Sequence, residues 1–209
     1  MSAHEQMEQA EHAEHAAHSN KGIALLISVL ALFLALSETL GKSAQTEGIS
    51  FNVEASNLWA FYQAKTIRQT SLVVAADALT VTLPTITDPA LKQATTKQIE
   101  AWKATAARYE SEPKPTGGEG RRELSARAIK AQEERDLALA KYHHFEYASA
   151  AFQIGIVLAS ATIITGLMAL AFGAGGLGVV GLIVMCFGLF APNVLHDAVH
   201  WFSHAGAAH

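Results

Sequence analysis

The stretch that most constrains the fold is residues 148–195, which contain no charged side chain. The hydrocarbon core of a bilayer is ~30 Å thick and takes ~20 apolar residues per helix. The stretch is therefore too long for one membrane crossing and suits two. Gly173, Gly175 and Gly176 stand where a tight turn between two spans is expected. We accordingly predict a transmembrane hairpin with helices at 148–172 and 177–191.

A second apolar run, residues 22–40, predicts another transmembrane helix near the N-terminus. The segment before it is acidic and no small-residue cleavage site follows directly, so an uncleaved span is favoured over a signal peptide. Glu38 near its end admits two interpretations. It is either a buried proton or cation site, or an interfacial residue that pairs with Lys42 four positions on. Its position at the end of the run favours the second.

Each predicted span has a face of small residues, and such faces let helices approach closely in lipid. The positions expected to make these contacts are Ala31, Ala35, Gly155, Ala159, Gly181 and Gly188.

Residues 41–147 form the polar part of the chain, in which acidic and basic side chains are evenly mixed. We predict a soluble helical bundle with helices at 42–83, 89–110 and 121–147; the first can run on from the first span. Pro84 ends the first helix, Asp88 and Pro89 are suited to cap and start the second, and residues 111–120 are a linker. The first helix has a heptad-like stripe, made of Ile49, Val53, Ser56, Ala60, Ile67, Val74, Ala78 and Val81.

The third helix has a coiled-coil-like seam and meets no helix breaker before residue 148. The seam consists of Leu124, Ala128, Ala131, Arg135, Ala138, Tyr142 and Phe145. These seams need partners, within one chain or between copies. Because their apolar residues are small, a single-chain domain would be marginal, which favours a homo-oligomer.

Histidines gather at both ends of the chain. His12, His15 and His18 lie in an acidic tail, residues 1–21, which we expect to be frayed or weakly helical. His196, His200 and His204 follow one another at helical spacing in residues 192–209, where Pro192 is expected to start an interfacial helix. Imidazole suits zinc, copper or nickel, so both clusters are candidate metal sites; the alternatives are a solubilising tail and the polar edge of the interfacial helix.

Two blocks of sequence resemble the domain of unknown function (DUF) 4337 family, small bacterial membrane proteins without an assigned activity. The first block comprises residues 41–47 and 54–68, and the second comprises residues 142–148 and 153–160. The resemblance extends over about residues 22–191 and leaves out both histidine-rich ends. It implies one N-terminal span, a helical soluble part and a C-terminal hairpin, and it supplies no substrate and no catalytic residue.

Aromatic residues cluster in the first block, at Trp59, Phe61 and Tyr62. They are either a docking face for a partner or another subunit, or the thickest layer of the bundle's own core. In the second block, His143, His144 and Glu146 are either a pH-sensitive hinge or a polar collar beside the second span.

Close to the spans, basic residues are more numerous on the side of the central part than on the N-terminal side, where only Lys21 is found. The positive-inside rule then predicts that the spans cross the inner membrane with the central part in the cytoplasm. Three spans place the two histidine clusters on opposite sides of that membrane. The basic residues counted on the central side are Lys42, Lys130, Arg135 and Lys141.

The sequence contains no nucleotide-binding loop, no paired cysteines and no catalytic triad pattern, so we do not expect an enzyme or a bound cofactor. A net charge of −4 argues against nucleic-acid binding. We predict an all-α membrane-anchored structural or interaction protein that contacts the bilayer, self-associates and could bind a further protein. The alternatives are transition-metal binding through the histidine-rich ends, and a transporter or channel subunit, although Gln153, Thr162 and Thr165 are few for an ion path.

Overall fold

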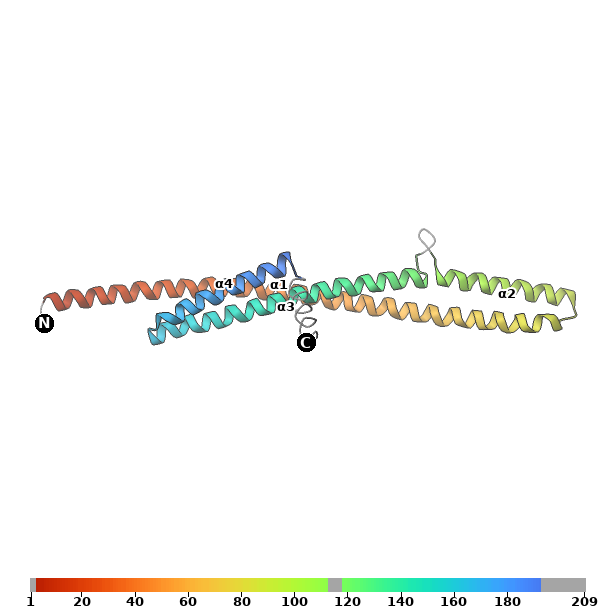
Figure 1. Cartoon of the computed structure of the whole chain (residues 1–209), viewed down its shortest axis with the longest axis horizontal. Helices are drawn as coiled ribbons and strands as arrows, with labels where there is room; N and C mark the ends of the chain where they lie inside the picture. Colours follow the sequence, from red (N-terminus) through yellow and green to blue (C-terminus); the bar gives the residue numbers. More distant parts are fainter. Residues whose placement is uncertain (1–2, 113–117, 193–209) are drawn as a thin grey trace, which may run out of the picture. The chain divides into compact units, whose positions relative to one another are not determined.

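The computed structural model describes the backbone of residues 3–112 and 118–192, and the side chains of residues 21–112 and 118–192. All regular secondary structure in this part of the chain is helical and it contains no strand, which confirms the all-α prediction (Figure 1). Three of the helices, α1, α3 and α4, are long and apolar enough to cross a membrane. The four α-helices are α1 (Ala3–Thr82), α2 (Pro89–Glu110), α3 (Arg121–Thr165) and α4 (Met168–Phe190).

Helix α1 is continuous from the N-terminal tail through the first apolar run and into the polar part of the chain. Of the two alternatives expected for the tail, the helical one agrees with the backbone from Ala3 onward. Extending an existing helix needs no new nucleus, and the tail is rich in alanine, glutamate and glutamine, which are good helix formers.

The ends of α1 and α2 follow the predicted signals. Pro84 has no backbone N–H and disfavours a helical Leu83, so α1 stops at Thr82 and a short 3-10 turn follows. Asp88 caps α2, because its Oδ1 accepts a hydrogen bond from the backbone N–H of Ala90 at 2.9 Å. Pro89 occupies the first turn, where a missing N–H costs nothing, and the predicted cap is confirmed.

The turn of the C-terminal hairpin lies earlier than the glycine cluster suggested. Helix α3 ends at Thr165 and α4 begins at Met168, so the expected helices at 148–172 and 177–191 are wrong in their boundaries. Gly166 has a φ of +72°, a left-handed conformation that ends helices and suits glycine. Gly173, Gly175 and Gly176 are instead helical and lie within α4.

The chain divides into two units, which we describe separately. The apolar unit comprises residues 1–48 and 136–209, and the hairpin unit comprises residues 49–135. In the apolar unit, α1 packs with α3 and α4 around Phe152, which is fully buried and stacks on Phe33 with ring centroids 5.9 Å apart. A Cβ added at Gly181 would lie 2.7 Å from the Phe152 ring.

In the hairpin unit, α2 and the beginning of α3 pair in turn with successive stretches of α1 (Figure 1). The unit is therefore two helices thick, and its core is thin. Leu58 of α1 packs against the alanine-rich start of α3. The residues of the predicted seam on α3 are all buried or half-buried, so this is the face through which α3 packs.

In the described part of the chain, most of the stripe predicted on α1 is exposed and does not pack against the other helices. Five of its members are 52–78% exposed: Ile49, Val53, Ile67, Val74 and Val81. Helix α1 instead packs through the opposite face, which includes Ala55, Leu58, Tyr62, Gln69 and Ala76. A two-helix layer covers only one face of α1, and the polar side chains on that face hold it there through hydrogen bonds.

Candidate functional site

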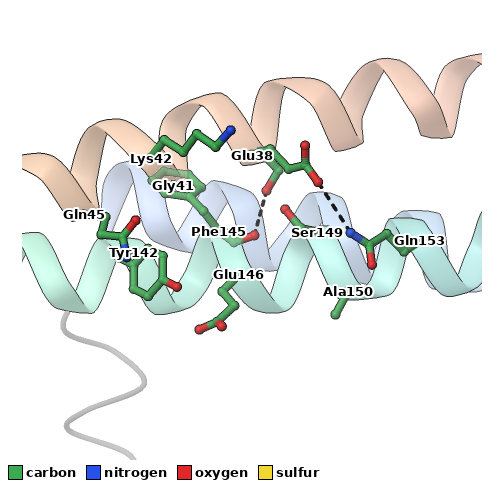
Figure 2. A pocket seen from close by; sticks show the side chains of 11 residues that line it. Glu38, Gly41, Lys42, Gln45, Tyr142, Phe145, Glu146, Ser149, Ala150 and Gln153 are labelled. Carbon is green, nitrogen blue, oxygen red and sulfur yellow. Dashed lines mark hydrogen bonds between the residues drawn. The ribbon is translucent and has the colours of Figure 1, made fainter.

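A polar groove lies between α1 and α3 of the apolar unit, where the apolar runs of the two helices end (Figure 2). Its volume is about 420 Å³, within the range of roughly 300–1,000 Å³ that is usual for ligand pockets. It is lined by Ser37, Glu38, Gly41, Lys42 and Gln45 of α1 and by Tyr142, Phe145, Glu146, Ser149, Ala150 and Gln153 of α3.

Small residues bring the two backbones together at the floor of the groove. Ser37 is fully buried and donates from Oγ to the carbonyl oxygen of Phe145 at 2.9 Å, which fastens α1 to α3. A Cβ added at Gly41 would lie 3.4 Å from the Cβ of Phe145. Because the helices touch through small residues, the longer side chains beside them become the walls of a groove.

The walls are two polar stripes with the same spacing. Glu38, Lys42 and Gln45 follow one another at steps of four and three on α1, and Tyr142, Glu146, Ser149 and Gln153 do so on α3. Neighbours at these steps share one face of a helix. The groove is therefore lined along its length by carboxylate, ammonium, amide and hydroxyl groups.

Glu38 is exposed, so its interpretation as a buried proton or cation site is wrong. Its Oε1 accepts a hydrogen bond from Nε2 of Gln153 across the groove at 3.5 Å, the upper limit for such a contact (Figure 2). Between residues of the described ranges, no ion pair involves Lys42, and the expected pairing with Glu38 is wrong because Glu38 turns toward α3. The charged groups of the groove thus retain capacity for a ligand.

The two histidines beside the groove have different environments. His143 is exposed and its Nδ1 lies 3.5 Å from Oε2 of Glu146. This contact between exposed polar groups agrees with the predicted polar collar. His144 is 1% exposed, and its Nδ1 lies 2.8 Å from the carbonyl oxygen of Ala140. It packs against α4 where Gly188 has no side chain. His144 is therefore a core residue.

A second polar cluster joins all three helices of the hairpin unit, and we call it the clasp. Arg121 of α3 donates to Oε2 of Glu110 at 3.0 Å and to the hydroxyl of Tyr62 at 2.9 Å, and it also binds Oε1 of Gln69. Gln69 in turn donates to the carbonyl oxygen of Ala106 in α2. The clasp supplies the specific contacts that the thin alanine core lacks.

The hydrogen bonds of the hairpin unit lower the pKa of two carboxyl groups. Two hydrogen bonds lower the pKa of Glu110 below its usual value of 4.5; the one from Gln69 has the larger effect and the one from Arg122 the smaller. A hydrogen bond from Ser111 lowers the pKa of Glu123 in the same direction. Both carboxylates therefore favour the folded hairpin in their charged form.

The aromatic cluster has two different surroundings. Trp59 and Tyr62 pack against the small core formed by α1 and α3, and their rings meet edge to face at 5.4 Å. Phe61 is 63% exposed. The interpretation as a core layer thus holds for Trp59 and Tyr62, and Phe61 alone remains available to a partner.

The small residues expected at helix contacts fall into two groups. Gly155, Ala159, Gly181 and Gly188 are all buried. Ala31 and Ala35 are exposed, so α1 does not pack through them within the described part of the chain, and their role in helix contacts stays a prediction. The reason is register: α1 presents Leu30 instead, whose methyl groups occupy the space left by Gly178 and Gly155. A contact made by a large side chain and a glycine needs a small residue on one helix only.

The candidate metal ligands lie outside the described side chains. His196, His200 and His204 belong to residues 193–209, and of His12, His15 and His18 the structure describes the helical backbone alone. Among the residues whose side chains are described, no group of three or more histidine, cysteine or acidic residues is placed to hold a metal ion.

Residues 19–191 match the family described as Domain of unknown function (DUF4337). The chain belongs to the DUF4337 family. The match covers the groove, the clasp and all three helices long enough to span a membrane, and it excludes the histidine-rich end after residue 191. Neither the curated proteins nor the solved structures contain a match to this chain. The family match thus identifies the architecture, and the role of this DUF4337 chain has to be inferred from its surfaces.

Sequence reasoning missed both the groove and the clasp. A signal for the groove exists in the 4/3 spacing of polar residues on each helix, directly beside the small residues that pack. The clasp has no comparable signal, because Gln69, Glu110 and Arg121 are far apart in sequence and each is an ordinary surface residue taken alone.

Proposed function

We propose that this protein is a membrane-anchored helical scaffold that self-associates through the unpartnered face of α1. The proposal rests on the exposed stripe of Ile49, Val53, Ala60, Ile67, Val74 and Val81, which we call the outward stripe. From Val53 onward its members recur every seven residues. Such a repeat buries one continuous seam against another helix.

Among the described residues of the hairpin unit, no helix covers this face. The outward stripe lies opposite the side of α1 that contacts α2 and α3, and Ile67, Val74 and Val81 are 68%, 62% and 78% exposed. Isolated exposed apolar residues are common on proteins, but a regular row of them usually marks an interface. A partner helix with the same repeat would remove the row from water.

The occupant that fits best is a second copy of the same chain. Residues 49–82 contain two acidic and two basic side chains, and Glu54, Lys65 and Arg68 lie off the stripe. Two copies therefore meet with little repulsion, Asp77 near the far end being the exception. β-branched Val and Ile at the recurring position match one of the two core positions of a two-stranded parallel coiled coil, while the other core position is polar, at Ser56, Gln63 and Thr70. Copies inserted in one membrane with the same orientation present their α1 helices in parallel.

The estimated area buried between two outward stripes is modest, and anchoring both copies in one membrane would assist their association. The stripe extends over 33 residues, or about 50 Å at 1.5 Å per residue. A strip ~10 Å wide then buries on the order of 1,000 Å² over both partners, just below the standard size of a stable interface. Anchoring both copies in one bilayer raises their effective concentration and compensates for the modest area. We place the anchors in the bacterial inner membrane and the hairpin unit in the cytoplasm.

The mass of the full-length protein in detergent or in nanodiscs tests this function. The wild type should have the mass of a dimer or higher oligomer, and the variant Ile67→Lys, Val74→Lys should be monomeric because it places four lysines in one thin seam. Its helical content should not change, since both side chains are exposed. Gln93→Lys, Gln98→Lys on the exposed surface of α2 is the matched control and should remain oligomeric. A monomeric wild type would refute the proposal.

A further inference from the structure

We propose that the polar groove between α1 and α3 binds the headgroup of a zwitterionic phospholipid that carries a primary ammonium group. The first support is its position along the two helices. Glu38 is the first charged residue after the apolar run of α1, and Glu146 is the last charged residue before the apolar run of α3. Lipid headgroups lie at this boundary of a membrane-spanning helix.

The charges of the groove favour a ligand that carries both signs. Glu38 and Glu146 supply two carboxylates, the second of which also lies 3.5 Å from Nδ1 of His143, and Lys42 supplies one ammonium group. The carboxylates suit a primary ammonium, whose three N–H groups donate to carboxylate and amide oxygens, and Lys42 suits a phosphate. A purely anionic headgroup satisfies Lys42 alone and faces two negative charges.

The neutral lining distinguishes primary from quaternary ammonium. A trimethylammonium group has no N–H to donate and is usually held by several aromatic rings. The groove offers a ligand one aromatic ring, that of Tyr142, because Phe145 is 3% exposed and packs in the core. Gln45, Ser149 and Gln153 supply hydrogen-bonding groups instead.

The apolar surface next to the groove can accommodate acyl chains. On α1, the face of Glu38 continues into the apolar run as Ala35 and Ala31, which are exposed. On α3, the face of Gln153 continues as Val157 and Ile164, which are 66% and 85% exposed. Exposed apolar side chains of both helices therefore continue the polar faces that line the groove, and we call them the apolar track.

Lipid retention by the purified full-length protein tests the proposal. Detergent micelles are doped with equal amounts of phosphatidylethanolamine, phosphatidylcholine and phosphatidylglycerol that have the same acyl chains, and bound lipids are counted by native mass spectrometry. We expect phosphatidylethanolamine to be retained about tenfold over each of the others, the change expected for losing one charge-assisted contact. Equal retention of the three lipids by the wild type would overturn the proposal, whatever the variants do.

Single substitutions assign the preference to the groove. Glu38→Gln should abolish the preference for phosphatidylethanolamine over phosphatidylcholine, and Lys42→Gln should lower the retention of both. Glu47→Gln, an exposed position on α1 outside the groove, is the control and should behave like the wild type. Retention of the full preference by Glu38→Gln would contradict the assignment to this site.

A soluble competitor separates a lipid from a small metabolite with the same headgroup. Phosphoethanolamine in millimolar excess should not displace the bound lipid, because it lacks the chains that contact the apolar track. Displacement by phosphoethanolamine at concentrations comparable to the lipid would show that the groove takes a water-soluble ligand, and the proposal would be wrong. None of these outcomes depends on the outward stripe, so self-association is tested separately.

Discussion

The apolar unit and the hairpin unit are built from the same two long helices but are stabilised in different ways. In the apolar unit, large side chains fit against glycines, as Phe152 does at Gly181 and Leu30 does at Gly178. In the hairpin unit the core is mostly alanine, and the clasp around Arg121 fixes the helices. Shape complementarity suits helices in lipid, where burial of apolar surface gains little. Polar contacts suit a thin helix pair in water.

The largest expected effect comes from filling a glycine position in the apolar unit. Gly181→Leu should destabilise this unit by roughly 3 kcal/mol, since overpacking a buried contact costs about 1–3 kcal/mol and Phe152 has no free space to move into. Gly176→Leu is the matched control, because nothing lies within 4 Å of the added Cβ there. Thermal denaturation in detergent measures the difference.

Leu158→Ala, which removes a half-buried side chain, should cost less than Gly181→Leu. Equal tolerance of Gly181→Leu and Gly176→Leu would show that close packing does not stabilise the apolar unit, and the contrast between the units would then fail.

A smaller effect is expected from the clasp. Arg121→Gln should destabilise the hairpin unit by about 1–2 kcal/mol, the value of hydrogen bonds to charged groups reduced for partial exposure. Arg122→Gln should cost less than about 0.5 kcal/mol, because that side chain is 74% exposed. Hydrogen exchange measured at residues 121–135 separates this effect from changes in the apolar unit. Equal effects of the two substitutions would contradict the clasp.

Lowering the pH should reduce the stability of the folded hairpin unit. Because the pKa values of Glu110 and Glu123 are lowered in the folded state, their stabilisation is present above the usual value of 4.5 and is lost as the pH falls below it. The fluorescence of Trp59 and Trp102, measured in a Trp201→Phe chain between about pH 5 and pH 3, should report this loss.

The double variant Glu110→Gln, Glu123→Gln is the control for acid, and its stability should depend less on pH in this range. The same slope in the variant and in the parent chain would show that other groups cause the loss.

The sequence predicted those features that depend on local pattern. The three apolar helices, the cap at Asp88 and the seam on α3 all follow from residue type and spacing, and the structure agrees. The hairpin turn was misplaced because a single residue decided it: Gly166 adopts a left-handed conformation, and the more conspicuous glycines at 173–176 stay helical. Periodicity alone does not show which of several glycines leaves the helix.

Helix α1 shows a second limit of pattern reasoning. The partner of its most regular apolar stripe was left open between the same chain and another copy, and within the chain α1 packs through a face with Ala55, Tyr62 and Gln69 instead. Two faces of one helix compete for a partner, and the clasp, which depends on residues from three helices, decides between them. Such long-range hydrogen bonds leave no periodic trace in the sequence.

Disulfide cross-linking in native membranes tests most directly whether the outward stripe joins two copies. In a chain with Cys186→Ala, Ile67→Cys places one thiol on the stripe, and Phe61→Cys places one at a similarly exposed position off it; the two native side chains are 68% and 63% exposed. Parallel copies should bring the two thiols at position 67 together, so Ile67→Cys should yield a disulfide-linked dimer, and Phe61→Cys should not form the disulfide cross-link. Equal cross-linking at both positions, or cross-linking at position 61 alone, would contradict association through the stripe.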